Sequence, residues 1–338
     1  MMLVRVVMVG LLLAGSAARA QAQGIIVDHT SLPLFEQIPE QYLQAAANLR
    51  MMFVNRSVGA NINDGLTCLS HPSTDAAPTS CKRYTHVVPE FSSSPSDVHW
   101  ARQGGYPRTN WSYFGWPGTG ILPELPCGTD TGFWYEQLEC FIRYVDANAA
   151  RFDVFSYQTS YLEVNTGSDI ASPTAGLFAR QANRFDIGDF EALEARHPGK
   201  VFILHTSSLA RAIGTEASTE LNNRLRQYAR ENNKYLLDVA ALVSHDPSGN
   251  PCYDNRDGVP YVVNGELREN YPDDGLALPA ICQHYTPEVN GGHLGNPDVA
   301  KIRVAKAFWI LMARIAGWNP AGGSTPPAAP TNLRVVGE

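Results

Sequence analysis

Helical and strand-like segments alternate along most of the chain, and this alternation is the strongest pattern in the sequence. Apolar residues recur at helical spacing over 39–49, 132–150, 186–196, 215–233 and 298–316. Short apolar runs typical of buried strands occur at 50–54, 152–164, 201–209 and 235–242. Parallel strands need crossover helices, which cover both faces of the sheet. We therefore predict an α/β domain with a central parallel sheet between two helical layers.

Two long stretches, 68–127 and 243–291, lack this periodicity and are rich in Gly, Pro, Ser and aromatic residues. The six cysteines lie at or near the edges of these stretches, at Cys68, Cys81, Cys127, Cys140, Cys252 and Cys282. An even set of cysteines in an exported chain favours disulfides, and short loops close at the smallest entropic cost. We predict the pairs 68–81, 127–140 and 252–282, which would staple two loop insertions.

The first 22 residues have the pattern of a secretory signal peptide, with Arg5 ahead of an apolar run at 6–14 and small residues after it. Small-x-small sites predict cleavage just before Gln21 or Gln23. The apolar run is short for a membrane span, and no later segment is long enough for one. We therefore expect a secreted or periplasmic protein without a membrane span in the mature chain.

Composition limits the function classes. The chain has 338 residues, of which 44% are apolar and 17% are charged, with a formal net charge of -7. These values exclude a disordered chain and make nucleic acid an improbable partner. There is no C-x-x-C or H-x-H pair, so we expect neither a metal ion nor another cofactor. Residues 23–318 are expected to form one domain.

Ser57 and His293 are the candidate catalytic residues. Ser57 follows the apolar run at 50–54 after Asn55 and Arg56, and Gly59 permits a tight turn into the next element. In a parallel sheet, ligands bind at the carboxyl ends of the strands, where a serine hydroxyl can attack and its backbone N–H can hold an oxyanion. His293 lies in a glycine-rich loop just before the last predicted helix and is a candidate base for that serine.

This joint arrangement resembles the SGNH/GDSL hydrolases, a family of esterases and lipases. The resemblance rests on Phe53-Val54-Asn55-Arg56-Ser57-Val58-Gly59 and on Gly292-His293-Leu294. It implies a flavodoxin-like three-layer α/β/α sandwich, with Ser57 as the nucleophile and His293 as the base. The first block departs from Gly-Asp-Ser, which marks a divergent member.

The resemblance leaves the third triad member open. The family's acid stands three residues before the histidine, where this chain has Asn290. Asparagine accepts a hydrogen bond from imidazole but carries no charge to stabilise its protonated form. The orienting group is therefore Asn290, Glu288, one of Asp273 and Asp274, or a backbone carbonyl.

The family's oxyanion hole also uses a glycine N–H and an asparagine amide. The backbone N–H groups of Ser57 and Gly59 and the amide of Gln158 are the expected donors here, with Asn165 as the alternative amide. Five glycines compete for the family's glycine position: Gly104, Gly105, Gly115, Gly118 and Gly120.

Export and the resemblance together predict a serine ester hydrolase. Eight aromatic residues, Trp100, Tyr106, Trp111, Tyr113, Phe114, Trp116, Trp134 and Tyr135, provide either a platform for sugar rings or the core of the stapled insertion. The substrate is then a small-molecule ester or an acyl group on a carbohydrate. The alternative is a non-catalytic extracellular binding protein with the same fold. Residues 319–338 form a Gly/Ser/Pro linker whose end resembles the opening strand of a fibronectin type III module.

Overall fold

A single parallel sheet organises the molecule. The computed structural model describes residues 24–55, 57–81, 99–115, 133–159, 161–164, 167–209, 215–254, 262–263, 266–267, 272, 274–282, 285, 294 and 299–320. The strands are β1 (Ile26–Val27), β2 (Met51–Asn55), β3 (Trp111–Gly115), β4 (Val154–Tyr157), β5 (Val201–His205) and β6 (Tyr235–Leu237). They lie in the order β1-β6-β5-β4-β2-β3, and every neighbouring pair is parallel.

The strand order reverses at β2. Counted from β2 as the first strand, β3-β2-β4-β5-β6 follow the order 2-1-3-4-5 of flavodoxin-like sheets, and β1 is added beside β6. From β2 the chain moves first to β3 on one side and later to β4 on the other. This reversal is the position where α/β sheets open a crevice for ligands.

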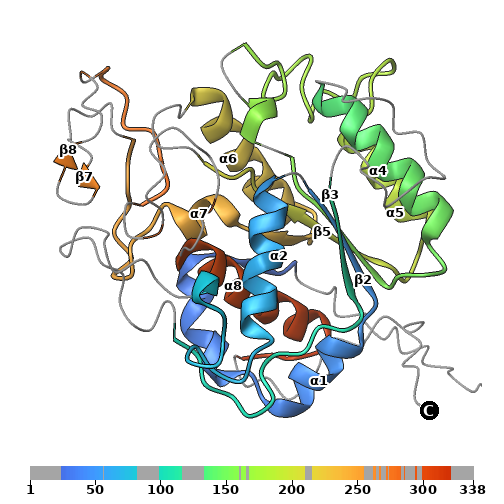
Figure 1. Cartoon of the computed structure of the whole chain (residues 1–338). Coiled ribbons are helices and arrows are strands. Elements are labelled where there is room, and N and C mark those ends of the chain that lie inside the picture. The colour runs from blue at the N-terminus through green and yellow to red at the C-terminus, as the bar shows by residue number, and fades with distance from the viewer. Residues whose placement is uncertain are drawn as a thin grey trace, which may run out of the picture.

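Helices cover both faces of the sheet (Figure 1). One face carries α1 (Glu40–Asn48), α2 (Ser57–Leu69), α7 (Val239–Val243), α8 (Val299–Ile315) and the 3-10 helix η1 (His29–Gln37). The other face carries α4 (Trp134–Asn148), α5 (Ile187–Arg196) and α6 (Glu216–Glu231). Each face has its own apolar cluster, so the predicted three-layer α/β/α sandwich is confirmed.

Smaller elements complete the fold. Two further 3-10 helices are η2 (Thr79–Cys81) and η4 (Tyr161–Val164), and β7 (Val262–Val263) pairs with β8 (Glu266–Leu267) in an antiparallel hairpin. Among the residues listed above, no helix combines the length and apolar character needed to cross a membrane.

Three local expectations were wrong. Gly59 does not form a tight turn into the next element, because α2 already begins at Ser57 and Gly59 lies in its first helical turn. The stretch at 68–127 was expected to lack regular structure, yet it contains the edge strand β3. The apolar run at 235–242 is not one strand, since the side chain of Asp238 accepts a hydrogen bond from the Ala241 N–H and starts α7.

The disulfide predictions hold where the structure describes both partners. Cys68 at the end of α2 is bonded to Cys81, and Cys252 is bonded to Cys282. Cys140 is also disulfide-bonded, and its predicted partner Cys127 lies outside the described residues. The bonds at 68–81 and 252–282 each close a loop in one of the two aperiodic stretches, which limits the conformations of the unfolded chain.

Helix α8 is the centre of its face, because α1, α2, α7 and η1 all pack against it. Every residue of α8 except Arg314 is buried, whereas the sequence pattern indicated one apolar face. Helices α2 and α8 approach each other closely at Gly65 of α2, where an added Cβ would lie 2.2 Å from the Lys301 backbone oxygen. The absence of a side chain at Gly65 therefore sets the spacing of α2 and α8.

Gly65→Ala is expected to lower the free energy of unfolding by about 1–3 kcal/mol, because the new methyl group meets backbone rather than a movable side chain. At a helix position without this contact, the same change would be stabilising by about 1 kcal/mol. Urea denaturation measures the difference, with Asp64→Ala at an exposed position of the same helix as the control. An unchanged or raised unfolding midpoint for Gly65→Ala would show that the helices have room to separate.

Candidate functional site

Ser57 lies at the point where the strand order reverses. It is the first residue of α2 and is exposed, while Val58 and Gly59 behind it are buried. The preceding strand β2 pairs with β3 on one side and β4 on the other, so Ser57 follows the carboxyl end of a strand inside the sheet. The first N–H groups of a helix have no partners within it and carry partial positive charge. The Ser57 hydroxyl therefore lies at the positive end of the α2 dipole.

The first turn of α2 packs directly on the end of β2. The Gly59 N–H donates to Asn55 Oδ1 at 3.0 Å. A Cβ at Gly59 would lie 2.4 Å from Asn55 Cβ and 2.8 Å from a ring carbon of Tyr113, so only glycine fits. Burial, with the charge of Asp64, raises the pKa of Tyr113 to about 12, which keeps its hydroxyl protonated to donate to Asn55 O at 3.2 Å.

A chain of buried side-chain hydrogen bonds runs from this turn across the ends of four strands. Asn55 Nδ2 donates to Gln158 Oε1 at 2.6 Å, and Gln158 Nε2 donates to Thr206 O at 2.9 Å. Thr206 Oγ1 then donates to Asp238 Oδ1 at 3.0 Å, and Arg226 holds both oxygens of that carboxylate. All members except Arg226 are buried. The chain ties Asn55, and through it the α2 turn, to β4, β5 and β6.

This chain changes the roles expected of two residues. Gln158 is buried, with its amide oxygen on Asn55 and its amide nitrogen on Thr206. The Gly59 N–H is used by Asn55. We therefore assign Gln158 and Gly59 to positioning the α2 turn rather than to an oxyanion hole. Among the competing glycines, Gly115 pairs in register with Asn55 at the end of β3.

Gln158→Leu is expected to lower the free energy of unfolding by about 1–3 kcal/mol, because the Asn55 amide and the Thr206 carbonyl lose a partner in a buried site. Gln227→Leu is the matched control, because the Gln227 amide bonds Glu231 on an exposed helix surface. Its expected effect is within about 0.5 kcal/mol. Denaturation in urea compares the two, and equal effects would mean that the chain contributes no stability.

The candidate base and every candidate residue for its orienting group except Asp274 lie outside the described residues. This applies to His293, Asn290, Glu288, Asp273 and also to the alternative amide Asn165. The structure does describe Leu294, which follows His293, and the candidate Asp274. Leu294 is fully buried in the same apolar cluster as Val58 of α2, whereas Asp274 is exposed and accepts a hydrogen bond from the Leu276 N–H.

One histidine is buried at the end of a strand. His205 is the last residue of β5, and its Nε2 lies 2.6 Å from Ser156 Oγ on β4. Its ring stacks on Phe53, with 5.3 Å between centroids, and also contacts Phe308. Complete burial lowers the pKa of His205 to about 3, so its ring is neutral at physiological pH. This pair lies inside the sheet layer, where it contributes to packing.

Most of the aromatic residues considered for sugar binding belong to the core instead. Trp100, Tyr106, Trp111 and Trp134 are buried, Tyr113, Phe114 and Tyr135 are half-buried, and Trp116 lies outside the described residues. Phe133, which precedes α4, is 57% exposed and stacks on Tyr135. In the described part of the chain, no group of three or more His, Cys, Asp or Glu residues is arranged to hold a metal ion.

Comparison of the chain with protein-family models, curated proteins and solved structures finds no match. The candidate site therefore rests on the residues and geometry of this chain itself. Sequence reasoning did not identify Asn55 as a site residue. The sequence feature that could have identified Asn55 is its position. It places a polar amide at the end of an apolar run, four residues before a glycine.

Proposed function

We propose that this protein is an exported serine ester hydrolase in which Ser57 is the nucleophile and His293 is the base. One observation carries the proposal: an exposed serine begins a 13-residue helix at the carboxyl end of the strand where the sheet order reverses. Open α/β sheets bind their ligands at this position. The helix N-terminus supplies N–H donors and partial positive charge for an anion.

In the proposed reaction, Ser57 Oγ attacks the acyl carbon while His293 accepts the hydroxyl proton. The oxyanion that forms accepts hydrogen bonds from N–H groups that include that of Ser57. The C–O bond to the alcohol then breaks, and the leaving alcohol receives the proton from His293. Water then attacks the acyl carbon of the acyl-serine while His293 accepts a proton from it. The bond to Ser57 Oγ breaks, and His293 returns the proton to Ser57. Asn290 or Glu288 orients the imidazole.

The chain next to His293 supports this pairing. Leu294 is buried in the apolar cluster that also contains Val58 of α2 and most of α8. The chain is therefore anchored, one residue after the histidine, on the face of the sheet that carries α2. The tie from Asn55 through Gln158 to Thr206 also supports the proposal, because a nucleophile must be held in a fixed position.

We further propose that the ester is an acyl group on a carbohydrate. The stacked pair Phe133 and Tyr135 lies at the start of α4, with 5.3 Å between ring centroids. Helix α4 leads back from β3 to β4, so its first turn lies toward the strand ends that Ser57 follows. An exposed aromatic face is suited to packing on a sugar ring. Phe133→Ala is then expected to raise KM for an acetylated oligosaccharide and to leave hydrolysis of p-nitrophenyl acetate unchanged.

A fluorophosphonate that reacts with activated serines tests the proposal without knowledge of the natural ester. The wild-type protein should gain one adduct, located by peptide mass spectrometry at Ser57. Ser57→Ala should gain none, and Ser70→Ala at the other end of α2 should react as the wild type does. A folded wild-type protein that stays unlabelled would instead favour a binding protein that keeps the sandwich without the chemistry.

A further inference from the structure

Two histidines are stacked face to face where η1 meets the chain that follows α7. The rings of His29 and His245 have 3.6 Å between their centroids and 4° between their planes. His29 is the first residue of η1, and His245 comes two residues after the end of α7. Neutral imidazole rings stack readily, whereas two protonated rings repel each other at this distance. The contact therefore depends on the protonation of both rings.

The chain after α7 is a small hairpin, which comprises residues 244–252. Two backbone hydrogen bonds join its arms, from Asp246 N to Asn250 O at 2.9 Å and from Cys252 N to Ser244 O at 2.8 Å. The disulfide of Cys252 fixes its base. Because these bonds lie within the hairpin or at its base, the hairpin can move against η1 without losing them.

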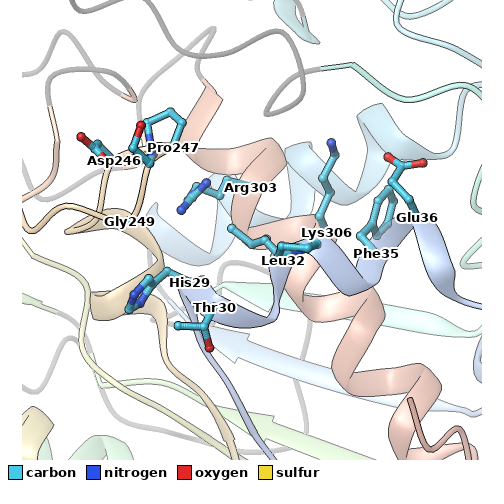
Figure 2. A pocket seen from close by; sticks show the side chains of 12 residues that line it. His29, Thr30, Leu32, Phe35, Glu36, Asp246, Pro247, Gly249, Arg303 and Lys306 are labelled. Atoms are coloured by element: carbon cyan, nitrogen blue, oxygen red, sulfur yellow. Dashed lines mark hydrogen bonds between the residues drawn. The ribbon is translucent and has the colours of Figure 1, made fainter. Parts of the chain in front are cut away.

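A cavity of about 550 Å³ lies between the hairpin and η1, and α8 provides the rest of its wall. Figure 2 shows His29 on the η1 side of this cavity and Asp246, Pro247 and Gly249 on the hairpin side. Along this boundary, the described residues of the two parts line open space, and the stacked histidines join them. Separation of the two rings would therefore widen the entrance to the cavity.

The hydrogen bonds around the rings show which atoms can take up a proton. His245 Nδ1 lies 3.0 Å from Ala241 O, and a carbonyl oxygen only accepts, so Nδ1 carries the hydrogen and Nε2 takes up the next proton. His29 Nδ1 is buried and, among the residues that the structure describes, has no hydrogen-bond partner. A protonated His29 would place an N–H without an acceptor at that atom. Opening the contact would let water accept this hydrogen bond, so protonation of His29 favours the open form.

The charged groups around His29 act in opposite directions. Burial and the neighbouring His245 hold the pKa of His29 below its usual value, and Arg303 of α8 acts in the same direction. Asp28 at the start of η1 and Asp238 before α7 oppose them. Both carboxylates already accept hydrogen bonds from other groups of the chain. They therefore act on His29 only from a distance.

On the hairpin side, the Asp246 carboxylate is directed to the hairpin backbone. It accepts hydrogen bonds from Ser248 N and Asn250 N, both at 2.8 Å. In the described part of the chain, neither histidine ring is hydrogen-bonded to a carboxylate, so a second proton on the stack has no direct counter-charge there. The other titratable or charged groups near the pair are Tyr285 and Arg303, which donate to the His245 carbonyl oxygen, and Glu36 and Lys306 on the cavity wall.

We propose that His29 and His245 form an acid-sensitive clasp, which is closed while the rings are neutral and opens when both are protonated. Above about pH 6.5, the ordinary range of a neutral histidine, the rings stack and hold the hairpin on η1. The open form gains as the pH falls further, because each solvated ring binds its proton more tightly there than in the stack. Opening moves the hairpin away from η1 and gives access to the cavity. The clasp is separate from Ser57 and does not depend on ester hydrolysis.

Distance measurement by electron paramagnetic resonance tests the opening. Spin labels are attached at Ser248→Cys on the hairpin and at Gln37→Cys at the far end of η1, both of which are exposed positions. At about pH 7.5 the labelled protein should give one distance, and at about pH 5 a second, longer distance should appear and should be lost again on return to neutral pH. An unchanged distance would overturn the proposal. Loss of the near-ultraviolet circular dichroism at the lower pH would also overturn it, because the whole fold would then be opening.

His29→Phe tests the assignment, because phenylalanine keeps a stacking ring and takes up no proton. The labelled variant should keep the single, shorter distance at about pH 5. His71→Phe is the matched control, since His71 lies in the loop closed by Cys68 and Cys81, and it should open as the wild type does. Equal opening of His29→Phe and the wild type would contradict the assignment. If His29→Phe does not fold, His245→Phe provides the same test from the other ring.

Discussion

Ser57→Ala is expected to lower kcat/KM for ester hydrolysis by about 10³- to 10⁶-fold, the range found when a nucleophile is removed from a serine hydrolase. Alanine removes the hydroxyl that we propose as the nucleophile and leaves the helix N-terminus and the strand end in place. Ser57 is exposed, so the free energy of unfolding should change by less than about 0.5 kcal/mol.

Two control variants separate chemistry from folding. Ser70→Ala removes a hydroxyl that bonds Thr67 O at the far end of α2, and it should keep the wild-type rate. His293→Ala should lose about 10²- to 10⁴-fold, as expected for loss of a general base, while His71→Ala should not. Hydrolysis rates of p-nitrophenyl acetate provide the comparison. A Ser57→Ala protein as active as the wild type would remove Ser57 from the mechanism.

Acidification is expected to lower the free energy of unfolding through His205. Burial lowers the pKa of His205 to about 3 in the folded protein, so the folded state keeps the ring neutral while the unfolded chain binds a proton below about pH 6.5. The contribution of His205 to the free energy of unfolding is fully present above about pH 6.5. It is lost as the pH falls toward the pKa of His205 in the folded protein. The slope approaches 1.4 kcal/mol per pH unit, which amounts to about 2 kcal/mol by pH 5.

Two substitutions isolate the contribution of His205. His205→Asn removes the titrating ring, so the slope of unfolding free energy against pH should become shallower between about pH 7 and pH 5. Ser156→Ala removes the partner at 2.6 Å and keeps the ring, so stability should fall at every pH while the slope stays. His29, whose pKa burial also lowers, contributes to the remaining slope. Equal slopes for His205→Asn and the wild type would show that folding does not lower the pKa of His205.

The alternation of helices and apolar runs was sufficient to predict the fold. Each apolar run indicates a strand buried on both faces, and this burial requires helices above and below the sheet. Several elements, β1 among them, were not predicted, and for β3 and α7 the reasons can be identified. The strand β3, Trp111–Gly115, lies within a disulfide-stapled stretch of Gly, Pro and Ser. In the run at 235–242, the capping role of Asp238 is a local signal that apolar periodicity overlooks.

The candidate site was only partly predictable. The apolar run before Ser57 was enough to predict that Ser57 follows the end of a strand. The strand has to end before helix α2 begins at Ser57. The roles of Asn55 and Gln158 depend on a contact between residues 103 apart in the sequence. The contact between Gln158 and Thr206, which are 48 positions apart, presents the same problem. Such pairings are set by strand order and register, which local patterns do not specify.

The most direct measurement of the central claim is to trap the acyl-enzyme. Acid quenching during turnover of p-nitrophenyl acetate, followed by peptide mass spectrometry, should find one acetyl group on the peptide that contains Ser57. His293→Ala should accumulate far less of this species, and Ser57→Ala none. An acetyl group on a different residue, or turnover with no acetyl group on Ser57 under conditions where deacylation is slow, would contradict the account.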